Sequence, residues 1–94
     1  MFRNIKIPRG AQIRAARCLL KLTQEQCATA AGVSLSTLKK FEQLEDTDVV
    51  LMHIKYDKVM KILNSFKDAG INFEVTEGNV GVYLDISEKF SLHN

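Results

Sequence analysis

The sequence predicts a mainly α-helical domain of about five helices that ends in a C-terminal β-hairpin. Three observations support this fold class. Apolar residues recur at helical spacing along residues 56–69, two helix-start signals lie within residues 23–42, and apolar and polar residues alternate on both sides of Glu77-Gly78-Asn79. A chain of 94 residues is long enough for one compact core and too short for two. We therefore expect a helical region over residues 1–70, with the hairpin and a short tail of residues 71–94 packed on the same domain.

The first helix is expected over residues 11–21. Pro8-Arg9-Gly10 interrupts regular structure just before it, and no helix-breaking residue occurs from Ala11 to Lys21. Apolar side chains at Ile13, Ala16 and Leu20 fall on one helical face, with basic side chains on or beside the other face.

Two short helices joined by a tight turn are expected next. Thr23 is a good N-cap, and Gln26 three residues later completes a capping box that predicts a helix over 24–31. Gly32 suits the left-handed position that ends this helix, and Ser34 can cap a further helix over about residues 35–43. Two helices that cross steeply also need a small residue at their closest approach and an apolar residue that locks them together, and Ala28 and Leu38 meet these needs.

The second half begins with an ambiguous segment and then becomes regular. Residues 43–48 look like an acidic loop, whereas 49–54 (VVLMHI) fit a buried strand, a short helix or an apolar edge used by a partner. Residues 56–69 form a predicted amphipathic helix that Gly70 ends. The hairpin is expected to pair 72–76 with 80–84.

Charge is distributed unevenly along a chain whose net charge is only +2. Residues 1–42 hold eight basic side chains and two acidic ones, whereas residues 43–94 hold five lysines and nine acidic side chains. The first half therefore suits a polyanionic partner, although a solvated basic surface without a partner explains the same pattern. The chain has no apolar run of the roughly 20 residues that span a bilayer, and its first residues do not resemble a signal peptide, so we expect a soluble, cytoplasmic protein. Cys18 and Cys27 are expected to be reduced and buried.

Residues 11–42 resemble the helix-turn-helix of phage-repressor or Cro-like regulators, the xenobiotic-response-element (XRE) family. The resemblance rests on IRAARCLLKLTQEQCATAAGVSLSTLKKFE, which agrees with the family pattern R-x-x-x-x-L-T-Q-E-x-x-A-x-x-x-G-V-S-x-x-T-L-x-x-x-E. It covers about a third of the chain and implies a lambda-repressor-like helix-turn-helix bundle.

The resemblance also implies roles for individual residues. The helix that starts at Leu35 would enter the DNA major groove, where lysine donates to guanine, serine bonds several bases and leucine packs on a thymine methyl group. Gln24 matches a glutamine that binds phosphate at a helix N-terminus. Arg17 and Glu42 match an ion pair that ties the first helix to the recognition helix, so Arg17 has either a structural or a DNA-binding role. The candidate DNA-binding residues are Arg14, Arg17, Gln24, Leu35, Ser36, Thr37, Lys39 and Lys40, and the candidate structural residues are Ala28, Gly32, Leu38 and Glu42.

Departures from the family concern the segment after the recognition helix. Residues 43–45 (QLE) lack the usual glycine and the proline that follows, and the linker up to Tyr56 is several residues too long. The position of the next helix and of any dimer surface beside it is therefore open. Val49, Val50, Leu51 and the edge of the hairpin are candidates for that surface.

The predicted function is a sequence-specific double-stranded-DNA-binding transcriptional regulator, a repressor that acts as a homodimer on a two-fold operator. The alternatives are a protein-interaction module of the same fold, such as an anti-activator or adaptor, and an antitoxin, with a partner protein bound through residues 49–54 or the 72–84 hairpin. We expect no cofactor, no metal and no enzymatic activity, because His53 and His93 are isolated and neither cysteine has a histidine near it in the sequence.

Overall fold

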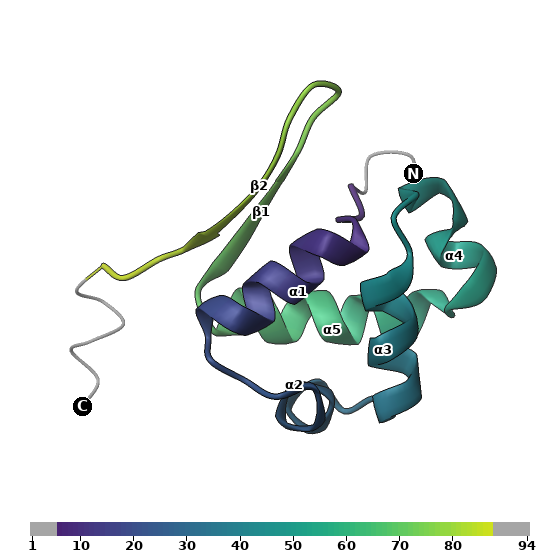
Figure 1. Ribbon diagram of the computed structural model, residues 1–94. Coiled ribbons are helices and arrows are strands. Elements are labelled where there is room, and N and C mark those ends of the chain that lie inside the picture. The colour runs from purple at the N-terminus through teal and green to yellow at the C-terminus, as the bar shows by residue number, and fades with distance from the viewer. Residues whose placement is uncertain (1–5, 88–94) are drawn as a thin grey trace.

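The computed structural model describes residues 6–87 and has a helical body with a hairpin on one side (Figure 1). The elements in chain order are α1 (Gly10–Leu19), α2 (Gln24–Ala31), α3 (Leu35–Gln43), a 3₁₀ turn η2 (Thr47–Val49), α4 (Val50–His53), α5 (Tyr56–Asp68), β1 (Ile71–Val75) and β2 (Val80–Leu84). The fold class predicted from the sequence is confirmed. No helix within residues 6–87 is long and apolar enough to cross a membrane.

α1 begins and ends earlier than the sequence predicted. Gly10 is its first residue, and Arg9 precedes it as the N-cap, with the Arg9 backbone N–H donating to Gln12 Oε1 at 2.9 Å. Lys21 lies outside the helix because its φ of 59° is left-handed. That conformation is uncommon for a residue other than glycine, and a lysine in the sequence does not predict it.

α2 and α3 have the bounds and caps that the sequence predicted. Thr23 Oγ1 accepts the Gln26 backbone N–H at 3.0 Å, and Gln26 Oε1 accepts the Thr23 N–H at 2.9 Å. Gly32 has a φ of 77°, and its N–H donates to the Ala28 carbonyl at 2.9 Å, as in a helix ended by a left-handed glycine. Ser34 then caps α3 by accepting the Thr37 N–H at 3.1 Å.

The ambiguous segment 43–54 contains η2 and α4, so the short-helix alternative is correct for residues 50–53. Asp46 caps η2 by accepting the Asp48 N–H at 2.9 Å. Val50 and Ile54 turn inward into the core, whereas Leu51 and Met52 are exposed by 46 % and 76 %. The expectation that Val50 contributes to a dimer surface is therefore wrong, because its side chain is already used in the fold.

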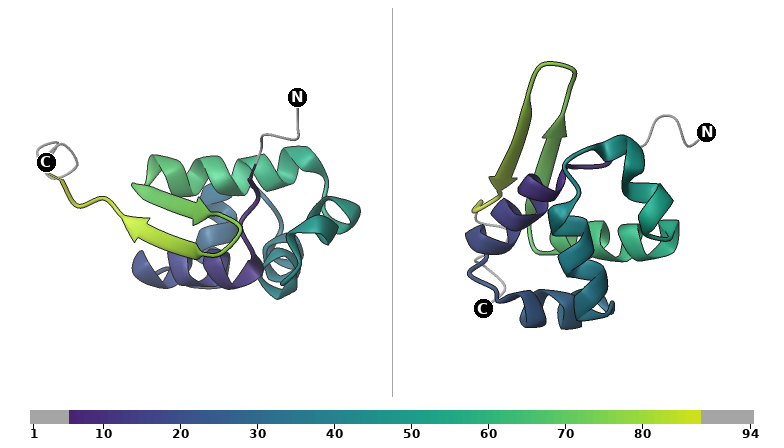
Figure 2. Two further views of the ribbon diagram at one scale, coloured as in Figure 1. Left: turned by 90° about the horizontal axis from the view of Figure 1, so that it is seen from above. Right: turned by 45° about the vertical axis from the view of Figure 1, so that its right-hand side comes forward.

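α5 and the hairpin follow closely on the predicted bounds. Gly70, with a φ of 95°, ends α5, and the chain reverses into β1. β1 and β2 are antiparallel, with Ile71 opposite Leu84 and Val75 opposite Val80. Figure 2 shows the hairpin lying across α1 and α5, and in Figure 1 it is on the opposite side of these helices from α2.

The core lies between α1, α2, α3 and α5, and the hairpin covers one end of it. Its largest fully buried side chains include Phe41, Phe66, Ile13, Leu38 and Ile62. Phe73 of β1 packs edge-on against Phe66 of α5 with ring centroids 5.8 Å apart. A fully buried side chain of this size stabilises the fold by about 1.5–3 kcal/mol relative to exposure. The Phe66–Phe73 contact therefore helps to hold the hairpin on α5.

The two cysteines differ in environment. Cys27 is buried in the core and Cys18 is exposed, and both are free thiols. The predicted burial of Cys18 is therefore wrong. On a helix, a residue two positions beyond the buried Ala16 points to the opposite side, and in α1 that side faces solvent.

Candidate nucleic-acid interface

Helix α3, which is expected from the sequence to be the recognition helix, has one buried face and one basic, exposed face. Leu38, Phe41 and Glu42 are buried, whereas Ser36, Lys39, Lys40 and Gln43 are exposed. These positions follow directly from the helical period, because residues 36, 39, 40 and 43 share one side of the helix. The structure thus presents two predicted lysines and one predicted serine together to solvent. Gln43 was not among the predicted site residues, although the same periodicity places it there.

Hydroxyl groups cluster where α3 begins. Ser34 Oγ lies 2.8 Å from Thr37 Oγ1 and 3.2 Å from Ser36 Oγ. A hydroxyl group both donates and accepts, so this cluster can bond to phosphate oxygens or to base edges. Thr37, predicted to contact the DNA backbone, lies half-buried at this end of α3.

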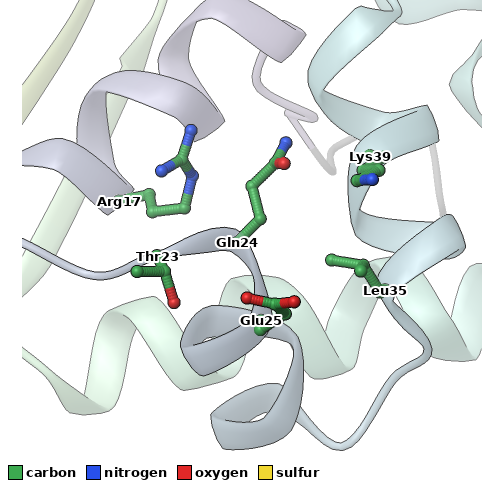
Figure 3. A pocket seen from close by; sticks show the side chains of 6 residues that line it. All are labelled: Arg17, Thr23, Gln24, Glu25, Leu35 and Lys39. Atoms are coloured by element: carbon green, nitrogen blue, oxygen red, sulfur yellow. The ribbon is translucent and has the colours of Figure 1, made fainter.

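On one side of α3, a recess separates it from the start of α2. Arg17, Thr23, Gln24, Glu25, Leu35 and Lys39 line this recess, which has a volume of about 380 Å³ (Figure 3). Gln24 and Glu25 occupy the first turn of α2, where backbone N–H groups have no acceptor within the helix and the helix dipole favours an anion. The predicted residues Gln24, Leu35 and Lys39 are therefore brought together from two helices.

Glu42 holds the three helices of this region in place from inside the fold. It is only 2 % exposed, and its carboxylate accepts from Arg17 Nε at 2.7 Å, from Arg17 Nη2 at 3.2 Å and from Gln24 Nε2 at 3.0 Å. The hydrogen bond to Glu42 raises the pKa of Arg17, and burial opposes this only in part. The carboxylate thus joins α1 to α3 and fixes the Gln24 side chain at the start of α2.

This geometry supports the structural one of the two roles that the sequence left open for Arg17. The third hydrogen bond of its guanidinium goes from Nη1 to the Leu22 carbonyl at 3.1 Å, so Arg17 also braces the turn between α1 and α2. Its side chain is 17 % exposed. The ion pair is present, and most of the donor capacity of Arg17 is used inside the protein.

Arg14 lies at the other end of the α1–α3 contact. Its Nη1 donates to the Glu42 backbone carbonyl, and its Nη2 lies 3.6 Å from Glu45 Oε2. The side chain is 44 % exposed, so it satisfies a carbonyl at the C-terminus of α3 and still has donors that face solvent.

A second recess on the other side of α3 holds basic residues that sequence analysis missed. Thr37, Lys40, His53, Ile54, Lys55 and Lys58 line it, and its volume is about 230 Å³. Lys55 is the N-cap of α5, and Lys58 lies in the first turn of that helix. Both belong to the half of the chain in which acidic residues predominate, so only the folded arrangement brings them beside Lys40.

The basic face of α3 is therefore flanked by a recess on each side, and each recess is lined by lysine. An α-helix fits into the major groove of B-DNA, and the phosphate strands run along both edges of that groove. Side chains on α3 can then reach base edges while α2 lies beside one strand and α5 beside the other. In the part of the chain that the structure describes, no group of three or more His, Cys, Asp and Glu side chains is placed to hold a metal ion.

Comparison with known proteins identifies the segment that contains this surface. The family model for the helix-turn-helix matches residues 13–46, which include most of α1, all of α2 and α3, and the start of the following loop. A search of curated proteins finds no matching sequence. Together with the capped α2–turn–α3 geometry, the match shows that residues 13–46 are a DNA-binding helix-turn-helix of the phage-repressor and Cro-like (XRE) family.

Proposed function

We propose that the protein is a sequence-specific transcriptional regulator that binds double-stranded DNA as a homodimer and represses from a two-fold operator. The observation that carries this proposal is the exposed face of α3, with Lys39 and Lys40 pointing to solvent between two recesses lined by lysine. An exposed helix fits into the DNA major groove, where its side chains can read bases, and the lysines on and beside it can bind phosphates.

The roles divide between base readout and phosphate contact. Ser36, Lys39 and Lys40 are the base-reading side chains, and Leu35 packs on a thymine methyl group. The first-turn N–H groups of α2, with Gln24 beside them, bind one phosphate strand. Thr37, Arg14, Lys55 and Lys58 contribute further phosphate contacts.

Arg17 and Glu42 serve this surface by positioning it. Their ion pair and the Glu42–Gln24 hydrogen bond fix α2 relative to α3. The distance between the phosphate-binding end of α2 and the base-reading face of α3 then stays constant when DNA binds, which reduces the entropy lost on binding.

A dimer follows from the size of the reading surface. One α3 with its two flanking recesses reads a single half-site, and tight specific binding buries more surface than one such module offers. Two copies related by a two-fold axis read two half-sites about one helical turn apart. A bound dimer of this kind represses by occupying DNA that the transcription machinery needs.

Selection from a random pool of duplex DNA, with the purified 94-residue chain, tests the proposal. The expected result is a two-fold symmetric motif whose affinity falls steeply as salt concentration rises, because lysine–phosphate contacts release counterions. Weak binding without any motif would contradict base readout by α3.

Replacing Lys40 with alanine tests its assigned role directly. We expect Lys40→Ala to weaken operator binding by roughly 1–3 kcal/mol and to relax the preference at one base position in each half-site. Affinity and base preference are compared by titration against the selected site and its single-base variants. Unchanged values for both would remove Lys40 from the base-reading set.

A further inference from the structure

The outer edge of β2 and one side of α1 form an apolar surface with no charged side chain. Ala11, Gln12, Ala15, Leu19, Val80, Gly81 and Val82 line an open groove of about 410 Å³ between them. Leu19 and Val80 are exposed by 44 % and 46 %. In a chain of which 26 % is charged, an uncharged groove of this kind is typical of a surface that contacts another molecule.

The hydrogen-bonding register shows which backbone groups of β2 face outward. At the loop end of the hairpin, the Thr76 N–H donates a hydrogen bond to the Asn79 carbonyl. At the open end, the Asp85 N–H donates a hydrogen bond to the Gly70 carbonyl. Antiparallel pairs alternate between bonded and non-bonded, so the pairs that contain Val80, Val82 and Leu84 are non-bonded. The N–H and C=O groups of these three residues therefore point away from β1, toward the groove side.

The edge of β2 also lacks the features that prevent an edge strand from pairing with a strand of another chain. Its sequence, VGVYL, has no lysine, no proline and no acidic residue, whereas β1 carries Glu74. Natural edge strands are usually protected by charge, proline or a bulge against pairing with another chain. An uncharged edge beside an apolar groove is thus suited to strand addition.

We propose that β2 pairs antiparallel with β2 of a second copy of this chain, about a two-fold axis at Val82. This interface rests on the proposed function, since it supplies the homodimer that a two-fold operator requires. The two hairpins join into one four-stranded sheet, in which Val82 bonds to the partner's Val82 and Val80 bonds to the partner's Leu84. Because the axis is perpendicular to the sheet, Val80 and Val82 of each copy lie over the Ala11–Ala15–Leu19 side of the other copy's α1.

Self-complementarity makes a second copy the occupant. In this register Gly81 lies opposite the partner's Tyr83, and Gly81 has no side chain that could collide with that ring. Within one chain, the Tyr83 ring already lies against Gly81. Asp85 lies opposite the partner's Asn79, so no like charges meet across the axis. A charged partner protein would find no opposite charge in this groove.

Another exposed apolar site, formed by Leu51 and Met52 on α4, is less suited to a two-fold contact. Leu51 and Met52 lie on a helix of four residues, directly after a segment that carries Glu45, Asp46 and Asp48. A two-fold axis through α4 would bring these carboxylates close to their own copies, and the resulting repulsion disfavours the contact.

Sedimentation equilibrium of the 94-residue chain without DNA tests the interface. We expect a dimer, and we expect Val80→Lys to raise its dissociation constant about tenfold or more, because each copy then places a charge in the apolar groove. Asn72→Lys, on the outer face of β1, is the matched control and should leave the constant unchanged. Met52→Lys tests the α4 site in the same way and should also have no effect.

Cross-linking gives a second readout that does not depend on destabilising the dimer. In a Cys18→Ser background, Val82→Cys should form an intermolecular disulfide under mild oxidation, because paired Cα atoms in such a position lie about 5.5 Å apart. Asn72→Cys in the same background should not. Circular dichroism of each variant checks that the helical fold is retained.

The outcomes separate this interface from the proposed function. A monomeric chain, a dimer weakened by Met52→Lys but not by Val80→Lys, or a folded Val82→Cys variant that does not cross-link would each overturn the β2 interface. A chain that dimerises through β2 and yet selects no DNA motif would leave the interface standing and contradict the proposed function alone.

Discussion

At the scale of single residues, Gly10 shows how closely two elements can approach when one side chain is missing. A Cβ atom at this position would lie 2.4 Å from the Glu42 carbonyl oxygen and 2.6 Å from that of Phe41. The Gly10 N–H also donates to the Leu44 carbonyl at 2.8 Å, so the start of α1 rests directly on the end of α3. Both neighbours are backbone atoms, and neither can move aside without shifting a helix.

Gly10→Ala should therefore lower the free energy of unfolding by about 1–3 kcal/mol, as overpacking does in a tightly packed core. Urea denaturation measures the change. Gly78→Ala in the hairpin loop is the matched control, because a Cβ atom there meets nothing within 4 Å and should change stability by no more than about 0.5 kcal/mol. Equal effects of the two substitutions would contradict the close approach at Gly10.

The two thiols should differ sharply in reactivity. Burial raises the pKa of Cys27 from 9.0 to about 11, and the nearby Glu42 carboxylate adds to the shift while Arg17 opposes it. The thiolate is the reactive form, so at pH 8 a thiol reagent should modify the exposed Cys18 and spare Cys27 until the protein unfolds. Thiol titration with and without denaturant checks this, and rapid modification of both cysteines in the folded protein would refute it.

The same shift has a consequence for stability at high pH. A folded-state pKa above the unfolded one means that the neutral thiol is favoured by folding. This contribution is fully present below pH 9 and is lost as the pH rises from 9 through about 11. Cys27→Ser should reduce that part of the alkaline loss of stability.

At the scale of elements, Gln12 fastens the hairpin to α1. It is 3 % exposed, and its Nε2 donates to the carbonyls of Glu74 and Gly81, both at 3.0 Å, one on each strand. Its Oε1 accepts the Arg9 N–H, so the same side chain caps α1. One amide thus joins the start of α1 to both strands of a hairpin that lies 62 and 69 residues away in the sequence.

Gln12→Leu should loosen the hairpin more than the helices. Loss of two hydrogen bonds to carbonyls costs about 1–3 kcal/mol in total, and the amides of β1 and β2 should exchange with solvent faster than those of α5. Amide hydrogen exchange followed by NMR resolves the two regions. Gln43→Ala, on the exposed face of α3, is the control, and hairpin amides that remain as protected in Gln12→Leu as in the parent would contradict the anchoring role.

Elements with strong local signals could be predicted from the sequence. The caps at Thr23 and Ser34 and the turn at Gly32 are local, which is why α2 and α3 have the predicted bounds. The early end of α1 could not be predicted, because Lys21 adopts a conformation that its own chemistry does not favour. The sequence of segment 43–54 stayed ambiguous because its helical structure depends on tertiary contacts, in which Val50 and Ile54 are buried in the core.

The candidate interface divides in the same way. Its α2 and α3 members follow from a contiguous motif, and the Arg17–Glu42 pair follows from the family resemblance. Lys55 and Lys58 reach the site only through the path of η2 and α4, which no local pattern specifies. Gln12 gives no sequence signal, since its bonding partners are backbone carbonyls near the other end of the chain.

At the scale of the whole molecule, folding rearranges the charge that the sequence divides into a basic and an acidic half. Among residues 43–87, the acidic side chains lie between α3 and α4, on and just after the hairpin, and on α5 at Asp57 and Asp68, whereas Lys55 and Lys58 join Lys40 beside the recognition helix. The basic face therefore draws on both halves of the chain. The number of phosphates that this basic face contacts determines how strongly DNA binding depends on salt.

Replacing Lys55 and Lys58 together with glutamine should test this arrangement. If each lysine neutralises one phosphate, the slope of log affinity against log salt should become shallower by about 2, and binding should weaken equally for all sequences. The preferred bases should stay the same, in contrast to Lys40→Ala. Titrations of the selected operator and an unrelated duplex over a range of salt concentrations give both quantities. Lys67→Gln, at the far end of the same helix, is the control and should leave the slope unchanged. A double variant with the parent slope would place the DNA on the α2 side of α3 alone.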